Sequence, residues 1–385
     1  MAEGGPLVRE SSLGAAATLH GLAPSSGQQK DASVADPILR LSQLSKRFGQ
    51  FAAVKEIDLA IHEGEFFTIV GPSGSGKTTL VRMLAGLEDP SGGEILLRGQ
   101  RINETPANRR PTCMVFQSLA LFPHRSVGQN IEFPLKMRGV PPAERRERAH
   151  ALMRQLRLPE DYYGKQVSQC SGGERQRIAL ARALAFDPEI LFFDEPLSAI
   201  DFRLRKTLEK ELKDIHRETG KTFVYITHSL EEAMVMSDRI GIMRAGELVQ
   251  VGAPDEIYSR PANRFVSEFM GEVNVLEVKP NGAGLHCAAL DTTFQGPEAT
   301  EDVAGGYLVI RPEYLRFLGP GETAENQVEG VLYNEYALGS RIQYQVRVGE
   351  QVFLVEKLRE QRYDGRLDDR VTIGWDARDS VLAPE

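Results

Sequence analysis

The segment that most constrains the fold of this chain is Gly71-Pro-Ser-Gly-Ser-Gly-Lys-Thr78. A strand-like run, Phe66–Val70, precedes it, and a periodic stretch that predicts a helix, Thr78–Leu87, follows it. This context fits a phosphate-binding loop, because glycines let backbone N–H groups turn toward phosphates at a helix start. We expect Lys77 to reach the terminal phosphates and the Thr78 hydroxyl to ligate Mg²⁺. The alternative is a glycine-rich turn without a ligand.

The pattern around this loop predicts an α/β domain over residues 38–271. Short strand-like runs alternate there with helical stretches. Ile190–Phe193 and Phe223–Ile226 are apolar at every position, as expected of parallel strands buried on both faces. Residues 118–175 interrupt the alternation with mostly helical, proline-containing sequence, and we interpret them as a helical subdomain.

The two ends of the chain differ from this middle part. Residues 1–37 are rich in Gly, Ala, Ser, Gln and Pro and predict a disordered tail. Residues 272–385 contain short β-like segments separated by Gly, Pro, Asn and Asp, which predict a small all-β barrel or sandwich. The expected segments are Glu272–Val278, Tyr307–Arg311, Val328–Tyr333, Arg341–Val348, Gln351–Val355 and Arg370–Trp375.

Charge and cysteine content disfavour several classes of protein. The net charge is −8, and residues 273–385 carry 11 basic against 19 acidic groups, while residues 38–272 carry 33 against 31. Without a basic stripe, we expect no nucleic-acid partner. The three scattered cysteines form neither a disulfide framework nor a metal-binding pattern, which favours the cytosol. No apolar run approaches the ~20 residues of a membrane span, and no secretory signal is recognisable.

A second motif, Ile190-Leu-Phe-Phe-Asp-Glu195, ends a predicted buried strand with two carboxylates. Strands of this kind deliver side chains to the carboxyl edge of a sheet, where ligands bind. We expect Asp194 to hold Mg²⁺ and Glu195 to orient or deprotonate an attacking water. An acidic pair that caps a helix is the alternative.

A third motif, Cys170-Ser-Gly-Gly-Glu-Arg-Gln-Arg177, opens the helical stretch Ile178–Ala185. A Ser-Gly-Gly run at a helix start is suited to an anion such as a phosphate. Taken alone, it is equally well explained as a helix cap.

In this order, the three motifs resemble the nucleotide-binding subunit of an ATP-binding cassette (ABC) transporter over about residues 38–271. The resemblance implies that Gln117 couples the Mg²⁺ site to membrane subunits and that Asp201 crosses between two ATPase subunits. It also implies that His228 contacts the γ-phosphate and that Phe48 stacks on adenine. Each has a simpler alternative: a surface glutamine for Gln117, a structural histidine for His228 and a core aromatic for Phe48.

The resemblance assigns four groups of site residues. The expected catalytic residues are Glu195 and His228, and the expected metal ligands are Thr78, Gln117 and Asp194. The nucleotide-binding set is Phe48, Gly71, Pro72, Ser73, Gly74, Ser75, Gly76, Lys77, Thr78 and Thr79. The signature, which would face ATP on a partner chain, is Ser171, Gly172, Gly173 and Glu174. The sequence departs from the family at Cys170 and Ile200, where leucine is usual, and at Glu174, where glutamine is usual.

The resemblance also implies a mechanism and a set of partners. Two chains would sandwich two ATP molecules with Mg²⁺, each ATP between one P-loop and the signature of the partner. Binding would close this homodimer and hydrolysis would reopen it, driving two integral membrane permease subunits supplied by a solute-binding protein outside the membrane. The chain would lie peripherally on the cytoplasmic face of the inner membrane.

The last third of the chain indicates the kind of transporter. Gly306–Phe317 contains an Arg-Pro-Glu segment similar to that of the accessory TOBE domain, an OB-related β domain of bacterial importers. Phe269–Leu276 and the segment Thr372-Ile-Gly-Trp-Asp376 are most similar to importers of the spermidine/putrescine (polyamine) type. Importers of ferric iron, thiamine, sulfate and phosphonate share this layout and remain alternatives. A soluble ABC-type ATPase acting on DNA or ribosomes, or a P-loop kinase, would be a rival from another class.

Overall fold

The computed structural model describes residues 36–198, 200, 202–282, 284–297 and 305–384. Residues 1–35, which hold most of the predicted tail, and Asp201 lie outside the described residues. Residues 36–385 form one compact unit. Among the described residues, no helix has the length and apolar character that a membrane span needs.

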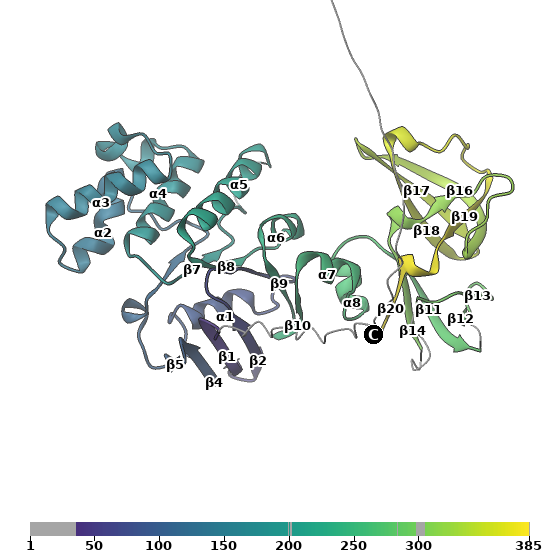
Figure 1. The fold of residues 1–385 in the computed structure, drawn as a ribbon, viewed down its shortest axis with the longest axis horizontal. Helices are drawn as coiled ribbons and strands as arrows, with labels where there is room; N and C mark the ends of the chain where they lie inside the picture. The colour runs from purple at the N-terminus through teal and green to yellow at the C-terminus, as the bar shows by residue number, and fades with distance from the viewer. Residues whose placement is uncertain (1–35, 199, 201, 283, 298–304, 385) are drawn as a thin grey trace, which may run out of the picture. The chain divides into compact units, whose positions relative to one another are not determined.

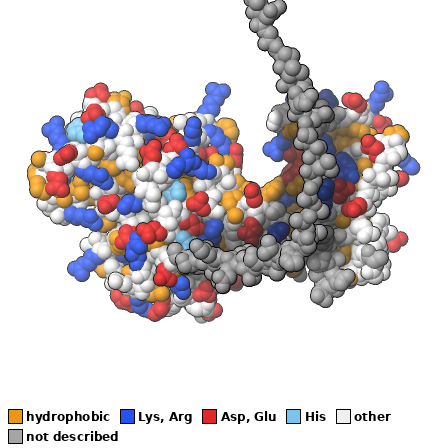
Figure 2. All heavy atoms as spheres, in the orientation of Figure 1, with side chains coloured by type: hydrophobic (Ala, Val, Ile, Leu, Met, Phe, Trp, Pro, Cys, Tyr) orange, Lys and Arg blue, Asp and Glu red, His pale blue; other side chains and the backbone are white. Residues whose placement is uncertain are grey.

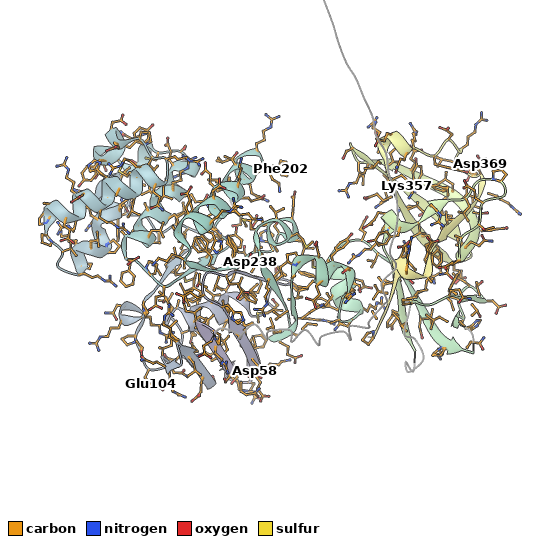
Figure 3. All side chains as sticks on the ribbon, in the orientation of Figure 1. Asp58, Glu104, Phe202, Asp238, Lys357 and Asp369 are labelled. Atoms are coloured by element: carbon orange, nitrogen blue, oxygen red, sulfur yellow. The ribbon has the colours of Figure 1, made fainter. Side chains whose placement is uncertain are left out.

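The central sheet of the α/β part has six strands in the order β10-β9-β3-β8-β7-β6 (Figure 1). Strands β3, β6, β7, β8 and β9 run parallel, and β10 pairs with β9 antiparallel. The strand bounds are β3 Phe66–Val70, β6 Thr112–Val115, β7 Ile190–Asp194, β8 Thr222–Ile226, β9 Arg239–Arg244 and β10 Glu247–Gly252. The Asp238 carboxylate (labelled in Figure 3) accepts a hydrogen bond from the Phe66 N–H at 2.8 Å and so joins the starts of β9 and β3.

The buried strands pack on both faces, as their continuous apolar runs predict. In β7, Leu191 and Phe193 belong to one hydrophobic cluster, which also contains residues of α3, α4 and α5. Ile190 and Phe192 belong to a second cluster, shared with α1 and an antiparallel sheet. This alternation explains why every position of such a strand is apolar.

The antiparallel sheet has the order β2-β1-β4-β5. Its strands are β1 Leu39–Phe48, β2 Phe51–Ile61, β4 Gly92–Leu97 and β5 Gln100–Arg101. Helices α2, α3 and α4 pack on one another within the predicted helical region and just beyond it (Figure 1). The helices are α1 Lys77–Leu84, α2 Val127–Met137, α3 Pro142–Gln155, α4 Gly172–Ala185, α5 Phe202–Thr219, α6 Leu230–Met236, α7 Pro254–Ser259 and α8 Arg264–Phe269.

The C-terminal part is all β, as predicted, and consists of two five-stranded sheets. One has the order β13-β12-β11-β14-β20 and the other β15-β19-β16-β17-β18. The strands are β11 Asn274–Asn281, β12 Gly284–Cys287, β13 Thr292–Phe294, β14 Gly306–Ile310, β15 Arg316–Phe317, β16 Asn326–Ala337, β17 Arg341–Val348, β18 Gln351–Leu358, β19 Arg370–Trp375 and β20 Ser380–Ala383. The two sheets share one hydrophobic core around the fully buried Trp375.

The Arg-Pro-Glu segment, directly after β14, has a structural role in the β part. Arg311 is 5% exposed and donates hydrogen bonds to the carbonyls of Ser267 at 3.2 Å and Tyr258 at 3.1 Å. Its guanidinium also lies 4.0 Å from the centre of the Tyr258 ring, and the Tyr258 hydroxyl donates to Glu313. The segment therefore ties the β part to the helices that end the α/β part.

The face drawn in Figure 2 shows basic and acidic side chains interspersed over the region of α2 to α5. This mixture agrees with the near-neutral balance of residues 38–272.

Candidate active site

The phosphate-binding loop connects β3 to α1, and its glycines are required by geometry. Gly71 and Gly76 have φ values of 157° and 104°. A Cβ atom on Gly71 would lie 2.2 Å from the carbonyl oxygen of Met243, and one on Gly76 would lie 2.3 Å from that of Ala53. Because both carbonyls belong to the backbone, neither can move aside. Only glycine fits at these two positions.

Lys77 lies inside the loop at the start of α1. Its ammonium donates hydrogen bonds to the carbonyls of Gly71 at 2.7 Å and Pro72 at 3.0 Å. Burial lowers the pKa of Lys77, while the charges of Glu195 and Asp194 oppose this shift. The ammonium therefore lies against the backbone of the loop, and a phosphate bound there would meet both its charge and the N–H groups of the loop.

A hollow of about 630 Å³ opens over this loop. It brings together parts of the chain that are far apart in sequence. Its lining consists of Phe51, Ala53, Ser73, Gly74, Ser75, Gly76, Lys77, Thr78, Thr79, Glu195 and His228. Most of the predicted nucleotide-binding residues and both predicted catalytic residues thus share one cavity.

Strand β7 places Asp194 beside Thr78. The Thr78 hydroxyl donates to Asp194 Oδ1 at 3.4 Å. Burial and the neighbouring charge of Glu195 raise the pKa of Asp194, and the Thr78 hydrogen bond partly offsets this. A hydroxyl oxygen and a half-buried carboxylate therefore meet at the edge of the loop.

Glu195 adopts an unusual backbone conformation directly after β7. Its φ is 47°, in the left-handed region that few residues other than glycine adopt. Its N–H donates to the carbonyl of Ile226 at 3.1 Å, which fixes the turn. The turned carboxylate lies 3.2 Å from His228 Nδ1, and together they face the hollow.

Gln117 and Glu195 are linked through Ser198. The Gln117 amide donates to the Ser198 hydroxyl at 2.9 Å, and this hydroxyl donates to the Glu195 carbonyl at 3.0 Å. Ser198 was not among the predicted residues, although it lies three positions before Asp201 in the sequence. Gln117 is not among the residues that line the hollow, and Asp201 lies outside the described residues.

The signature residues lie away from the hollow, at the start of α4. Ser171 caps the helix: its hydroxyl accepts from the Glu174 N–H at 3.3 Å, and the Glu174 carboxylate accepts from the Ser171 N–H at 2.7 Å. This backbone hydrogen bond lowers the pKa of Glu174. Cys170 is buried, with its thiol 3.7 Å from the Gln166 carbonyl. The unusual residue therefore packs inward, while Gly172 has open space above it.

Two aromatic residues are candidates for the side chain expected to stack on adenine. Phe48 and Phe51 pair across the β1–β2 hairpin, and both are exposed. Phe51 lines the hollow, whereas Phe48 lies with its ring 4.9 Å from the Lys46 ammonium and is not part of the lining. Phe51 is therefore a second candidate for stacking on adenine, and the resemblance to the family had pointed only to Phe48.

Comparison with known proteins identifies the two parts of the chain. Residues 54–198 match the family model described as ABC transporter, and residues 308–382 match the model described as TOBE domain. These matches confirm the predicted fold class, a P-loop ATPase core followed by a TOBE-type β domain.

Similar full-length proteins and solved structures agree with this division. The spermidine/putrescine import ATP-binding protein of Roseobacter denitrificans is 47% identical over 298 residues, which cover 76% of this chain and 82% of that protein. Its counterpart in Rubrobacter xylanophilus is 41% identical over 357 residues, covering 89% and 93%. An ATP-binding cassette solved as a dimer with ADP and Pi is 32% identical, covering 56% of this chain and 98% of that one at a TM-score of 0.50. The chain therefore belongs to the family of ABC-transporter ATP-binding subunits that carry a TOBE domain.

Proposed function

We propose that this chain hydrolyses ATP to power polyamine import through integral membrane permease subunits. Two observations support this: the convergence of the P-loop, Glu195 and His228 on one hollow, and the similarity to two spermidine/putrescine import ATP-binding proteins over most of the chain. The peripheral location on the cytoplasmic face of the membrane, and supply by a solute-binding protein, follow from the same assignment.

The residues around Thr78 and Asp194 fit a magnesium ion. Mg²⁺ is usually held by one or two protein oxygens together with substrate phosphates and waters. Thr78 and Asp194 supply two such oxygens, and a cation beside Asp194 would offset the burial and the Glu195 charge that raise the pKa of this carboxyl group. When bound, the ion would neutralise charge on the phosphates. We assign Gln117 to the same ion, although its amide contacts Ser198 in this conformation.

The chemistry proposed for this chain is attack of water on the γ-phosphate. Lys77 and the loop N–H groups hold the phosphates, and Glu195 orients the water and takes its proton. His228, whose Nδ1 atom lies 3.2 Å from Glu195 Oε2, would contact the γ-phosphate. Phe48 or Phe51 would stack on the adenine ring.

We further propose that each site is completed by a second copy of this chain. Ser171, Gly172, Gly173 and Glu174 are absent from the lining of the hollow in the described part of the chain. The exposed start of α4 carries N–H groups suited to a phosphate. Asp201 would act where the two copies meet.

Static light scattering tests this two-chain site. The Glu195→Gln chain with saturating ATP should have about twice the 42.7 kDa mass of one chain, since ATP binds but is not consumed.

A Cβ on Gly172 meets nothing within 4 Å, so Gly172→Glu should leave the folded chain intact while opposing the ATP of the partner. We expect Gly172→Glu to lose ATPase activity yet keep ATP binding and melting temperature. A mass of 42.7 kDa at saturating ATP, or full activity of Gly172→Glu, would count against the shared site.

A further inference from the structure

A buried carboxylate lies behind the histidine of the proposed site. Glu232, on α6, is 3% exposed. Its Oε2 atom accepts hydrogen bonds from the Tyr225 hydroxyl at 2.9 Å and the Thr227 hydroxyl at 2.7 Å. Burying a carboxylate costs several kcal/mol unless hydrogen-bond donors and countercharges compensate it. The Glu232 carboxylate therefore depends on the groups around it.

The same glutamate contacts both neighbours of His228. Its carboxylate accepts from Thr227, and its backbone N–H donates to the Ser229 hydroxyl at 3.3 Å. The Ser229 N–H in turn donates to Thr227 Oγ1 at 2.9 Å. The side chain of His228 itself is 58% exposed, so its direction depends on the backbone on either side of it.

Arg205 supplies the countercharge from a different helix. Its Nε atom lies 4.0 Å from Glu232 Oε1 and is buried without a hydrogen-bond partner among the described residues. Its Nη2 atom donates to the Ile200 carbonyl at 3.0 Å. Of the other charged groups nearby, Lys206 contacts Glu209 at 3.0 Å and Glu231 at 2.6 Å. Glu232 is thus anchored to α5 as well as to β8.

We propose that Glu232 is a positioning residue for ATP hydrolysis. It fixes the loop Thr227–Ser229 so that the His228 ring is held beside Glu195 and directed into the hollow. The inference rests on the role proposed above for His228. Displacement of a reacting group by about 1 Å can cost about 100-fold in rate, which sets the expected size of the effect.

A matched pair of variants separates positioning from simple stability. Tyr225→Phe and Thr227→Val each remove one hydroxyl that donates to the same oxygen of Glu232, but only Thr227 adjoins His228. We expect Thr227→Val to lower kcat for ATP by about 10- to 100-fold with KM changed less than about twofold. Tyr225→Phe should keep kcat within about threefold, and Thr227→Ser, which retains the hydroxyl, should restore the activity lost in Thr227→Val.

A double variant tests whether the effect runs through the histidine. On a His228→Ala background, Thr227→Val should cause no further loss, because the group being positioned is gone. Equal losses of kcat in Tyr225→Phe and Thr227→Val, or a full additional loss in the double variant, would overturn the proposal. If His228→Ala is inactive and Thr227→Val is fully active, the positioning role of Glu232 is overturned while the role of His228 stands. A fully active His228→Ala would overturn the role of His228 itself, and this proposal with it.

Discussion

At the scale of single residues, the account depends on separate roles for Lys77 and Glu195. Lys77 lies within the loop proposed to hold the phosphates, so Lys77→Ala should weaken ATP binding by about tenfold or more and nearly abolish turnover. Glu195→Gln preserves size but removes the base, so it should lower kcat by about 10²- to 10⁴-fold and leave the Kd for ATP within about twofold. Calorimetry of ATP binding and assays of phosphate release distinguish the two. Wild-type turnover in Glu195→Gln, or undiminished ATP affinity in Lys77→Ala, would refute these assignments.

Residues of the hollow could be predicted where the sequence pattern that marks them lies within one short segment. The phosphate-binding loop depends on glycine conformations and on an adjacent strand and helix, all visible within about 20 residues of sequence. The link from Gln117 to Ser198 spans 81 residues and has no local signature. Phe51 lines the hollow and Phe48 does not, although the two are paired in the β1–β2 hairpin, and apolar periodicity does not distinguish two paired, exposed aromatic residues.

At the scale of elements, a buried arginine packs against the end of α1. Arg110 is 1% exposed and donates to the carbonyls of Met83 and Leu84 at 2.8 Å. The Met83 carbonyl also accepts from the Gly86 N–H at 3.1 Å. It also donates to the carbonyls of Ile102 at 2.8 Å, Asn103 at 3.3 Å and Thr105 at 2.8 Å.

Replacing this arginine should therefore destabilise the chain strongly. Arg110→Met removes five hydrogen bonds to backbone carbonyls, and we expect the free energy of unfolding to fall by about 3–5 kcal/mol. Arg109→Met, at an exposed neighbouring position, should change it by less than about 0.5 kcal/mol. Urea denaturation followed by circular dichroism measures both. Similar stabilities for the two variants would show that the carbonyls find other partners.

Helix α5 contains a histidine whose burial should make stability depend on pH. His216 packs against the rings of Phe66 and Phe223, with centroid distances of 5.2 and 5.0 Å, and its Nε2 atom is buried without a hydrogen-bond partner among the described residues. Burial lowers the pKa of His216. The unfolded chain therefore takes up this proton first, near the ordinary pKa of about 6.5. The stability from His216 is complete above that value and is lost as the pH falls through the lower folded pKa.

The His216→Phe variant removes this proton but keeps an aromatic ring in the same apolar surroundings. Between pH 7.5 and 5.5, we expect the wild-type melting temperature to fall more steeply than that of His216→Phe. Parallel slopes for the two proteins in differential scanning calorimetry would mean that His216 is protonated equally readily in both states.

The elements themselves were predicted well wherever burial imposes a simple period. The runs Phe66–Val70, Arg341–Val348 and Arg370–Trp375 coincide with β3, β17 and β19. Helix ends were less accurate: Thr78–Leu87 was expected, and α1 spans Lys77–Leu84. Gly86, whose φ is 76°, ends the helix: its N–H donates to the Met83 carbonyl at 3.1 Å, and the Leu87 N–H donates to the Arg82 carbonyl at 2.8 Å. This glycine is a local signal, whereas the expected range followed the apolar periodicity alone.

At the scale of the whole molecule, an ATPase core and a TOBE-type β domain lie in one chain. Among the described residues, no helix could span a membrane. The contribution proposed for this chain is the cycle of ATP binding and hydrolysis, delivered to permease subunits. The buried contacts of Arg311 make the β part continuous with the helices that end the ATPase core.

The most direct test of the central claim is uptake of radiolabelled spermidine and putrescine in a host whose only copy of this subunit is the intact chain or its Lys77→Ala variant. Protein amount and membrane association are followed in parallel, so that a loss of uptake cannot come from a loss of protein. The account predicts that both polyamines accumulate with the intact chain, and that Lys77→Ala abolishes accumulation while remaining at the membrane. Unchanged polyamine uptake with Lys77→Ala would contradict it.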